Sequence, residues 1–336
     1  MSTPHPQRES IARSRRIDPA LLVGIEGKID ECHQISHWKR VAEVAPFGAI
    51  YLGGAWLATT GGDKWPMLVI AVVVMGVAMN ALGILIHDGL HGLLARSAVA
   101  NHFWGFLCGL PILMSATAYR KTHTDHHFEF GRAMDYGTYR QHLGKPGLVW
   151  CAYLLQLFFG CVLYIVLIPV LGMRGARMRV RLMIVTELVL IAGFVALLAH
   201  AFSFHELMIY WIAPAVVMMA LTNLRGLASH ALGDLGDIYL SSRTVSSNRL
   251  VRFLFLHENY HLEHHLFPQV PSYHLQTAHR LVWERLPRAL YAASYFDFLR
   301  GFFRSLGNLS LSPVGWVEPA GKSRAESMKT TPSSAS

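Results

Sequence analysis

Histidine offers the most distinctive chemistry in this chain, which has 19 histidines among 336 residues. Eight of them fall into three short clusters, which are His87-Asp88-Gly89-Leu90-His91, His123-Thr124-Asp125-His126-His127 and His261-Leu262-Glu263-His264-His265. Residues three or four positions apart lie on one face of a helix, so each cluster can direct imidazole nitrogens to a common point. Because imidazole is the commonest metal ligand in proteins, the clusters predict a metal site.

The number of nitrogens limits the kind of metal site. Eight imidazoles exceed the four ligands of a zinc ion and suit two ions with five or six ligands each. Imidazole binds iron, copper, nickel and zinc, so the ligand type does not select the element. Burying this many polar rings near a membrane costs several kcal/mol unless they are paired or bound, and a metal centre supplies that partner.

The remaining histidines share no common spacing. Those at the ends of apolar segments are interpreted as single interfacial polar residues: His102, His200, His205, His274 and His279. Four others are expected to be solvated: His5, His33, His37 and His142.

Acidic residues accompany the clusters. A metal-bound imidazole usually donates its second N–H to a carboxylate or a carbonyl oxygen. Five acids are suitably placed in the sequence for this supporting role: Asp88, Asp125, Asp135, Glu258 and Glu263. The alternative for each is an ordinary charge on a helix surface.

A second motif overlaps the third cluster. His257-Glu258-Asn259-Tyr260-His261 matches HExxH, the zinc metalloprotease signature in which the glutamate is the general base. A membrane-embedded zinc protease is the less favoured hypothesis, because it leaves the first two clusters unexplained. A five-residue match also arises easily by chance in a histidine-rich chain.

The elements that position these clusters are apolar. The chain is 52% hydrophobic and 15% charged, whereas a soluble domain is about 25% charged. Runs at about 42–61, 66–86, 182–202 and 207–228 are long enough to cross a hydrocarbon core of roughly 30 Å. They predict about four transmembrane helices in two hairpins. Segment 102–118, broken by Gly105, Gly109 and Pro111, is expected to be re-entrant, and 147–173 interfacial or re-entrant.

The fold class that follows is an all-α polytopic membrane protein. Basic residues mark cytoplasmic loops, and they concentrate in the N-terminal arm and between Arg174 and Arg181. This bias places all three clusters in a cytoplasmic histidine-rich cap. We expect the membrane to be the bacterial inner membrane. We expect a basic cytoplasmic arm (1–41), a membrane domain (42–317) and a disordered tail (318–336).

Other protein classes are disfavoured by composition. The net charge of +9 could suit nucleic acid, but the long apolar runs argue against that partner. The four cysteines are scattered without a CxxC pair, which argues against a disulfide scaffold, an iron–sulfur site and a zinc ribbon.

The motifs HDGLH, HTDHH and HENYHLEHHLFPQVP, in this order and interleaved with apolar runs, resemble those of the membrane fatty-acid desaturase superfamily. That superfamily also contains membrane hydroxylases and carotenoid ketolases. The resemblance covers roughly residues 40–290, and the stretch LFPQVPSYHL favours the acyl-lipid desaturase branch. It implies two iron ions held mainly by histidines, O2 as the oxidant, and a further histidine after the last span, here His230.

The predicted ligand set therefore has nine members: His87, His91, His123, His126, His127, His230, His261, His264 and His265. Two departures from the family pattern concern acids. Asp88 follows the first histidine where glutamate is common, and only Glu129 and Asp135 stand where the family often has a longer acidic signature. These departures bear on the substrate branch more than on the metal centre.

The predicted activity is O2-dependent oxidation by a membrane di-iron oxidoreductase that introduces a double bond into a fatty-acyl or lipid chain. The alternative is a hydroxylase or ketolase that acts on a carotenoid or another apolar or small amphiphilic molecule. The metal centre carries the chemistry, and no further catalytic residue is assigned.

Electrons must come from outside the chain, because the sequence has neither a GxGxxG dinucleotide motif nor an evident haem domain. We expect a separate donor of ferredoxin or cytochrome type, with its reductase. Basic residues could steer such a donor: Arg120, Lys121, Arg280, Arg285 and Arg288, with those of the 174–181 loop.

Overall fold

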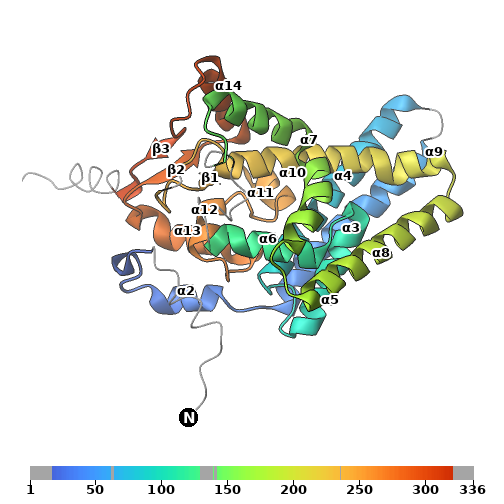
Figure 1. The fold of residues 1–336 in the computed structure, drawn as a ribbon, viewed down its shortest axis with the longest axis horizontal. Coiled ribbons are helices and arrows are strands. Elements are labelled where there is room, and N and C mark those ends of the chain that lie inside the picture. Colours follow the sequence, from blue (N-terminus) through green and yellow to red (C-terminus); the bar gives the residue numbers. More distant parts are fainter. Residues whose placement is uncertain (1–16, 62–63, 129–138, 140–141, 235, 321–336) are drawn as a thin grey trace, which may run out of the picture. The chain divides into compact units, whose positions relative to one another are not determined.

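The computed structural model describes residues 17–61, 64–128, 139, 142–234 and 236–320, and they are mainly helical (Figure 1). The chain divides into two compact units. The helical unit comprises residues 35–227 and 248–257, and the terminal unit comprises residues 1–34, 228–247 and 258–336. The terminal unit is thus built from both ends of the chain.

The helical unit contains the long apolar helices, several of which are prominent in Figure 1. Its elements in chain order are α3 (His37–Thr60), α4 (Trp65–Leu90), α5 (Ala98–Gly109), η2 (Leu110–Ile112), α6 (Ala116–Phe128), α7 (Pro146–Met173), α8 (Met178–Ala201), α9 (Phe204–Leu207), the π-helical η3 (Met208–Ile212), α10 (Ala213–His230) and α11 (Arg249–Leu254).

Within the described residues, five helices are long and apolar enough to cross a membrane. Four of them, α3, α4, α8 and the continuous run Phe204–His230, correspond to the four predicted spans. The fifth is α7, which was expected to be interfacial or re-entrant. This helix runs unbroken for 28 residues through Gly160 and Pro169, so the two residues do not interrupt it. By length and composition there are five candidate spans in the described residues, where about four spans were predicted.

The turns of both predicted hairpins coincide with helix ends. Gly61 ends α3 and Lys64 precedes α4. In the second hairpin, Ser203 caps α9 in a reciprocal capping box with Glu206. A capping box satisfies two backbone donors at a helix start, so a new helix begins between the apolar runs 182–202 and 207–228.

The break predicted within 102–118 is confirmed. Helix α5 with η2 and helix α6 pass the same test for membrane spans as a pair, but they are bent by 103°. Leu113, between them, has left-handed backbone with φ of 59°. Such a bend describes a broken span or a re-entrant loop.

Small side chains allow α6 to pack closely in this unit. A Cβ atom added at Gly172 of α7 would lie 2.9 Å from the Cα of Ala118 in α6. Ala116 and Ala118 also belong to a buried apolar cluster with Ile86 of α4, Ile168 of α7 and Ile184 of α8. The first half of α6 is therefore enclosed by three longer helices.

The terminal unit combines short helices with a small sheet. Its elements are η1 (Pro19–Leu21), α2 (Glu26–Cys32), β1 (Arg243–Val245), α12 (His261–Leu266), α13 (Ser272–Val282), η4 (Trp283–Arg285), β2 (Ala289–Ala292), α14 (Tyr295–Gly307) and β3 (Trp316–Val317). The sheet order is β1-β2-β3, with the first pair parallel and the second antiparallel. The all-α prediction is wrong here, because strands of two to four residues are too short to show an alternating pattern.

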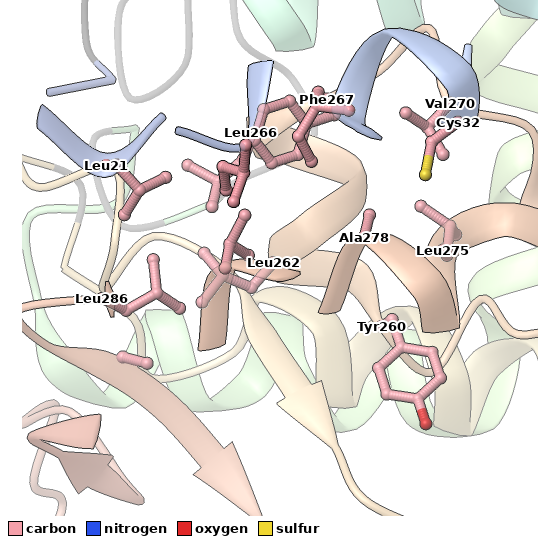
Figure 2. Packing of buried hydrophobic residues seen from close by; sticks show 14 of the residues in the cluster. Leu21, Cys32, Tyr260, Leu262, Leu266, Phe267, Val270, Leu275, Ala278 and Leu286 are labelled. Carbon is pink, nitrogen blue, oxygen red and sulfur yellow. The ribbon is translucent and has the colours of Figure 1, made fainter. Parts of the chain in front are cut away.

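The core of the terminal unit joins distant parts of the sequence (Figure 2). Leu21 and Cys32 from the N-terminal segment pack in one buried cluster with Leu266 of α12, Leu275 of α13 and Leu286. Residues 17–34 of the predicted arm are therefore helical and packed. Residues 1–16 and 321–336 lie outside the described part of the chain, and the cytoplasmic location of the arm stays a prediction.

Candidate metal centre

Four histidines of the helical unit converge at the ends of α4 and α6, and we call them the α4/α6 cluster. His87 lies in the last turn of α4 and His91 caps its C-terminus, whereas His123 and His127 are one turn apart on α6. One nitrogen from each of the four lies within 4.8 Å of the others. Helix spacing places the histidines of each motif on one face, and the packing of α4 against α6 brings the two motifs together.

The spacing of the nitrogens fits a metal ion. The Nε2 atom of His123 lies 2.9 Å from that of His91 and 3.0 Å from that of His127. Two nitrogens bound at about 2.1 Å to one ion, at a right angle, would lie about 3.0 Å apart. The donor set and its separations therefore suit one transition-metal ion at this cluster.

His126 occupies the adjacent position on α6. Its ring centroid is 5.7 Å from those of His123 and His127. The structure therefore places it on the same helix, beside the α4/α6 cluster.

Asp88 is held by a buried arginine that the sequence analysis did not select. Arg40 of α3 donates hydrogen bonds of 2.5 Å to Asp88 and to Glu43. It was overlooked because a basic residue before an apolar run is ordinarily a topology marker. The pair ties the end of α4 to the start of α3.

An asparagine fixes the backbone next to His91. Asn101 of α5 donates a 2.7 Å hydrogen bond to the carbonyl of Gly89 and accepts one of 2.9 Å from the amide of Leu94. Its side chain is 2% exposed. Nothing in the sequence around Asn101 identifies this role, because its partners come from another helix.

The terminal unit brings together the other four predicted ligands, and we call them the α10/α12 cluster. His230 ends α10, and its Nε2 atom lies 3.0 Å from that of His261 at the start of α12. The ring of His265 is 4.8 Å from both. His264 stacks against His261 at 5.3 Å. The nitrogen separation again suits ligands of one ion.

Two acids support α12 in different ways. Glu258 lies 3.4 Å from Nδ1 of His261, a placement that favours the tautomer with a free Nε2 lone pair. Glu263 is fully buried and accepts a 2.6 Å hydrogen bond from the Thr244 hydroxyl of β1. It also lies 2.6 Å from Nδ1 of His279 of α13. The interpretation of His279 as an isolated interfacial residue is therefore wrong.

Arg243 of β1 supports the end of α10. Its guanidinium donates to the carbonyl oxygens of Ala228 and Ala231 at 2.5 and 3.1 Å, and to that of Val314 at 3.0 Å. Its Cζ atom also lies 4.9 Å from the ring centroid of Phe298. The first two carbonyls bracket His230, so this wholly buried cation secures the turn that presents it.

The zinc-protease hypothesis does not fit the backbone. HExxH sites place both histidines on one helix, a turn apart. Here Leu256 and His257 have left-handed backbone, with φ of 46° and 62°, and α12 begins only at His261. His257 therefore precedes the helix and the motif lacks its required geometry.

The other predicted residues have simpler environments. Asp125 forms an ion pair with Lys121 on α6, as expected for a helix-surface charge, and Asp135 and Glu129 lie outside the described residues. His33, expected to be solvated, contacts the Ile29 carbonyl at 2.8 Å, and burial lowers its pKa. His37, His142, His200 and His205 are exposed, and His274 is half-buried.

Known proteins support the family resemblance. Residues 63–298 match the family described as fatty acid desaturase. The mouse protein named sphingolipid delta(4)-desaturase/C4-monooxygenase DES2 is 27% identical over 260 residues, covering 73% of this chain and 71% of that protein. Its rat counterpart is 27% identical over 236 residues, covering 66% and 67%. This chain belongs to the membrane fatty acid desaturase superfamily and is an oxidoreductase enzyme.

Proposed function

We propose that this enzyme is an O2-dependent di-iron oxidoreductase that desaturates the long chain of a membrane lipid. The observation that carries the proposal is the pair of four-histidine clusters, each with Nε2 atoms about 3.0 Å apart. Each cluster would hold one iron ion, and His126 would complete the set of nine ligands. When bound, the iron would activate O2 for removal of hydrogen from an unactivated C–H bond.

The residues of the chain would hold the ligands neutral and oriented. A neutral imidazole binds metal through one nitrogen when the other keeps its proton. Glu258 would accept a hydrogen bond from the Nδ1–H group of His261. This contact would leave Nε2 of His261 free to bind the ion. Asp88, held by its hydrogen bond from Arg40, would stabilise the end of α4 that carries His87 and His91.

The substrate proposal is a lipid with a long saturated chain, of acyl or sphingoid type. The family and the printed names of the relatives support it. Those names also pair desaturation with C4-monooxygenation, which supports hydroxylation as a second candidate activity of this chain. Loss of a second neighbouring hydrogen would give the alkene, and transfer of oxygen to carbon would give the alcohol.

Two electrons would reach the centre from a ferredoxin- or cytochrome-type donor with its reductase. Among the predicted steering residues, Arg285 is engaged with the carbonyls of Leu21 and Val23, and Arg288 pairs with Asp237. Arg120 and Arg280 are exposed and remain suited to an acidic donor. We also propose an inner-membrane location with the clusters facing the cytoplasm, supported by the arginines between 174 and 181.

The test is lipid analysis of a bacterial host that expresses the chain with a donor and its reductase. The wild type, His126→Ala and the exposed control His200→Ala would be fed saturated acyl and sphingoid precursors. We expect new unsaturated or hydroxylated lipids with the wild type and with His200→Ala, and none with His126→Ala. Identical lipid profiles for all three folded proteins would refute the proposal.

A further inference from the structure

A buried carboxylate lies within the apolar helix α8. Glu187 is 5% exposed, and α8 is one of the five candidate spans. An ionisable side chain inside a membrane span is costly, and it is usually kept for a specific partner. The partners of Glu187 therefore indicate what the residue does.

Both oxygens of Glu187 engage the segment before and at the start of α6. One oxygen accepts hydrogen bonds from the Ser115 hydroxyl at 2.6 Å and from the Thr117 amide at 3.0 Å. The other accepts from the Thr117 hydroxyl at 2.6 Å and lies 3.2 Å from Nε2 of His102. Three of these four contacts come from Ser115, just before α6, and Thr117, its second residue.

The start of α6 needs such a partner. Its first residue, Ala116, follows the 103° bend of a candidate broken span. The first amides of a helix have no acceptor within the helix, and no water replaces it inside a bilayer. Ser115 accepts from the Ala118 amide at 3.1 Å, and Glu187 supplies the acceptor for Thr117. Its negative charge also favours the positive end of the helix dipole.

The same helix carries His123, His126 and His127 in its second half. An α-helix turns by about 100° per residue, so a shift of its start by one residue would turn all three imidazoles away. The close approach of Gly172 to Ala118 leaves little room for another register. The start of α6 is therefore the point at which its rotation is set.

We propose that Glu187 is a positioning residue: a cap that α8 provides to α6 and that fixes the rotation and depth of the second histidine motif. The proposal rests on the proposed function only in treating those histidines as metal ligands. The cap itself is a property of the metal-free chain, so the two can be tested separately.

The first test measures hydrogen exchange of the purified full-length, metal-free protein in nanodiscs. The variants are Glu187→Leu, the conservative Glu187→Gln, and Thr186→Val as an exposed neighbour on α8. Glu187→Leu leaves the Ser115 and Thr117 donors without their acceptor, so gel filtration first checks that it is folded. Glu187→Gln, which keeps an acceptor oxygen, carries the test if Glu187→Leu does not fold. We expect it to speed exchange at least tenfold in peptides from 116–128 and not in peptides from 65–90, with Glu187→Gln intermediate and Thr186→Val unchanged.

The second test titrates Co²⁺ into the same proteins and follows its visible spectrum. A lost supporting contact typically weakens metal binding by about 10–100-fold, so we expect that loss at one of two sites in Glu187→Leu. Unchanged exchange in 116–128 would overturn the proposal. Equal Co²⁺ affinities of Glu187→Leu and the wild type would also overturn it, even if the variant has an altered thermal stability. A wild type that binds no Co²⁺ but shows the exchange change would reject the proposed function and leave the cap supported.

Discussion

The guanidinium of Arg40 lies 2.5 Å from the carboxylate of Asp88, and both side chains are buried. The residue that follows His87 is therefore paired with the first turn of another helix, across 48 positions of sequence. The same guanidinium also engages Glu43. One cation thus pairs with two carboxylates beside a predicted metal ligand.

Replacing Arg40 alone should be strongly destabilising. Arg40→Met would leave Asp88 buried without its cation, and removal of one partner of a buried pair typically costs about 3–5 kcal/mol. The double variant Arg40→Met with Asp88→Asn should recover a large part of that loss. Thermal unfolding of the four proteins in detergent measures the cycle, and strictly additive effects would contradict the coupling.

The two histidine clusters should be separable by metal content. His123→Ala should lower bound iron from about two ions per chain to about one, because each cluster is proposed to hold one ion. His261→Ala should do the same, and the double variant should bind almost none. Elemental analysis after gel filtration measures this, with the exposed His205→Ala as the control. Loss of both ions in each single variant would instead indicate interdependent binding.

The contact between Glu263 and His279 should stabilise the terminal unit. His279→Ala removes a 2.6 Å partner from a fully buried carboxylate, and leaving such a group unsatisfied costs roughly 1–3 kcal/mol or more. We expect faster hydrogen exchange in peptides from α12 and β1, because Glu263 joins these elements through Thr244. Thr277→Ala, exposed on the same helix, should leave the exchange unchanged. Equal exchange rates in His279→Ala and Thr277→Ala would argue against a stabilising contact between Glu263 and His279.

Arg243 should not tolerate lysine. Its planar fork donates to three carbonyl oxygens, a geometry that a single ammonium group does not reproduce. Arg243→Lys should lose about 2 kcal/mol or more of stability and should weaken metal binding at the α10/α12 cluster more than at the other. Titration of Co²⁺ into the metal-free protein measures the second effect, with Arg304→Lys on the exposed side of α14 as control. Wild-type stability and wild-type Co²⁺ affinity of Arg243→Lys would contradict a role of Arg243 in positioning His230.

Sequence spacing predicted which histidines gather, because helix periodicity acts over three or four residues. It also predicted the break near Pro111 and the hairpin between runs 182–202 and 207–228, where local backbone chemistry decides the structure. It did not predict Arg40, Arg243 or Glu187, because their partners in other elements are chosen by tertiary packing and not by local sequence. His279 was missed for the same reason, since its partner Glu263 comes from another helix.

The strands were not predicted, and α7 was given a different role from the other long helices. The two differences have separate causes. A three-residue strand such as β1 is fixed by its neighbours rather than by its own composition. Helix α7 was predicted to be interfacial or re-entrant because one more membrane crossing would put the histidine motifs on opposite sides of the membrane. Its length and uniform apolarity, by themselves, place it with the other spans.

The core shown in Figure 2 has a consequence for biosynthesis. Leu21 and Cys32 leave the ribosome long before Leu275 and Leu286, yet they share one buried cluster with them. The N-terminal segment therefore cannot pack in this cluster until the apolar helices and the C-terminal partners have been translated. The α10/α12 cluster can reach its final form only after translation has passed residue 286. The proposed binding of iron at that cluster would consequently be among the last steps of maturation.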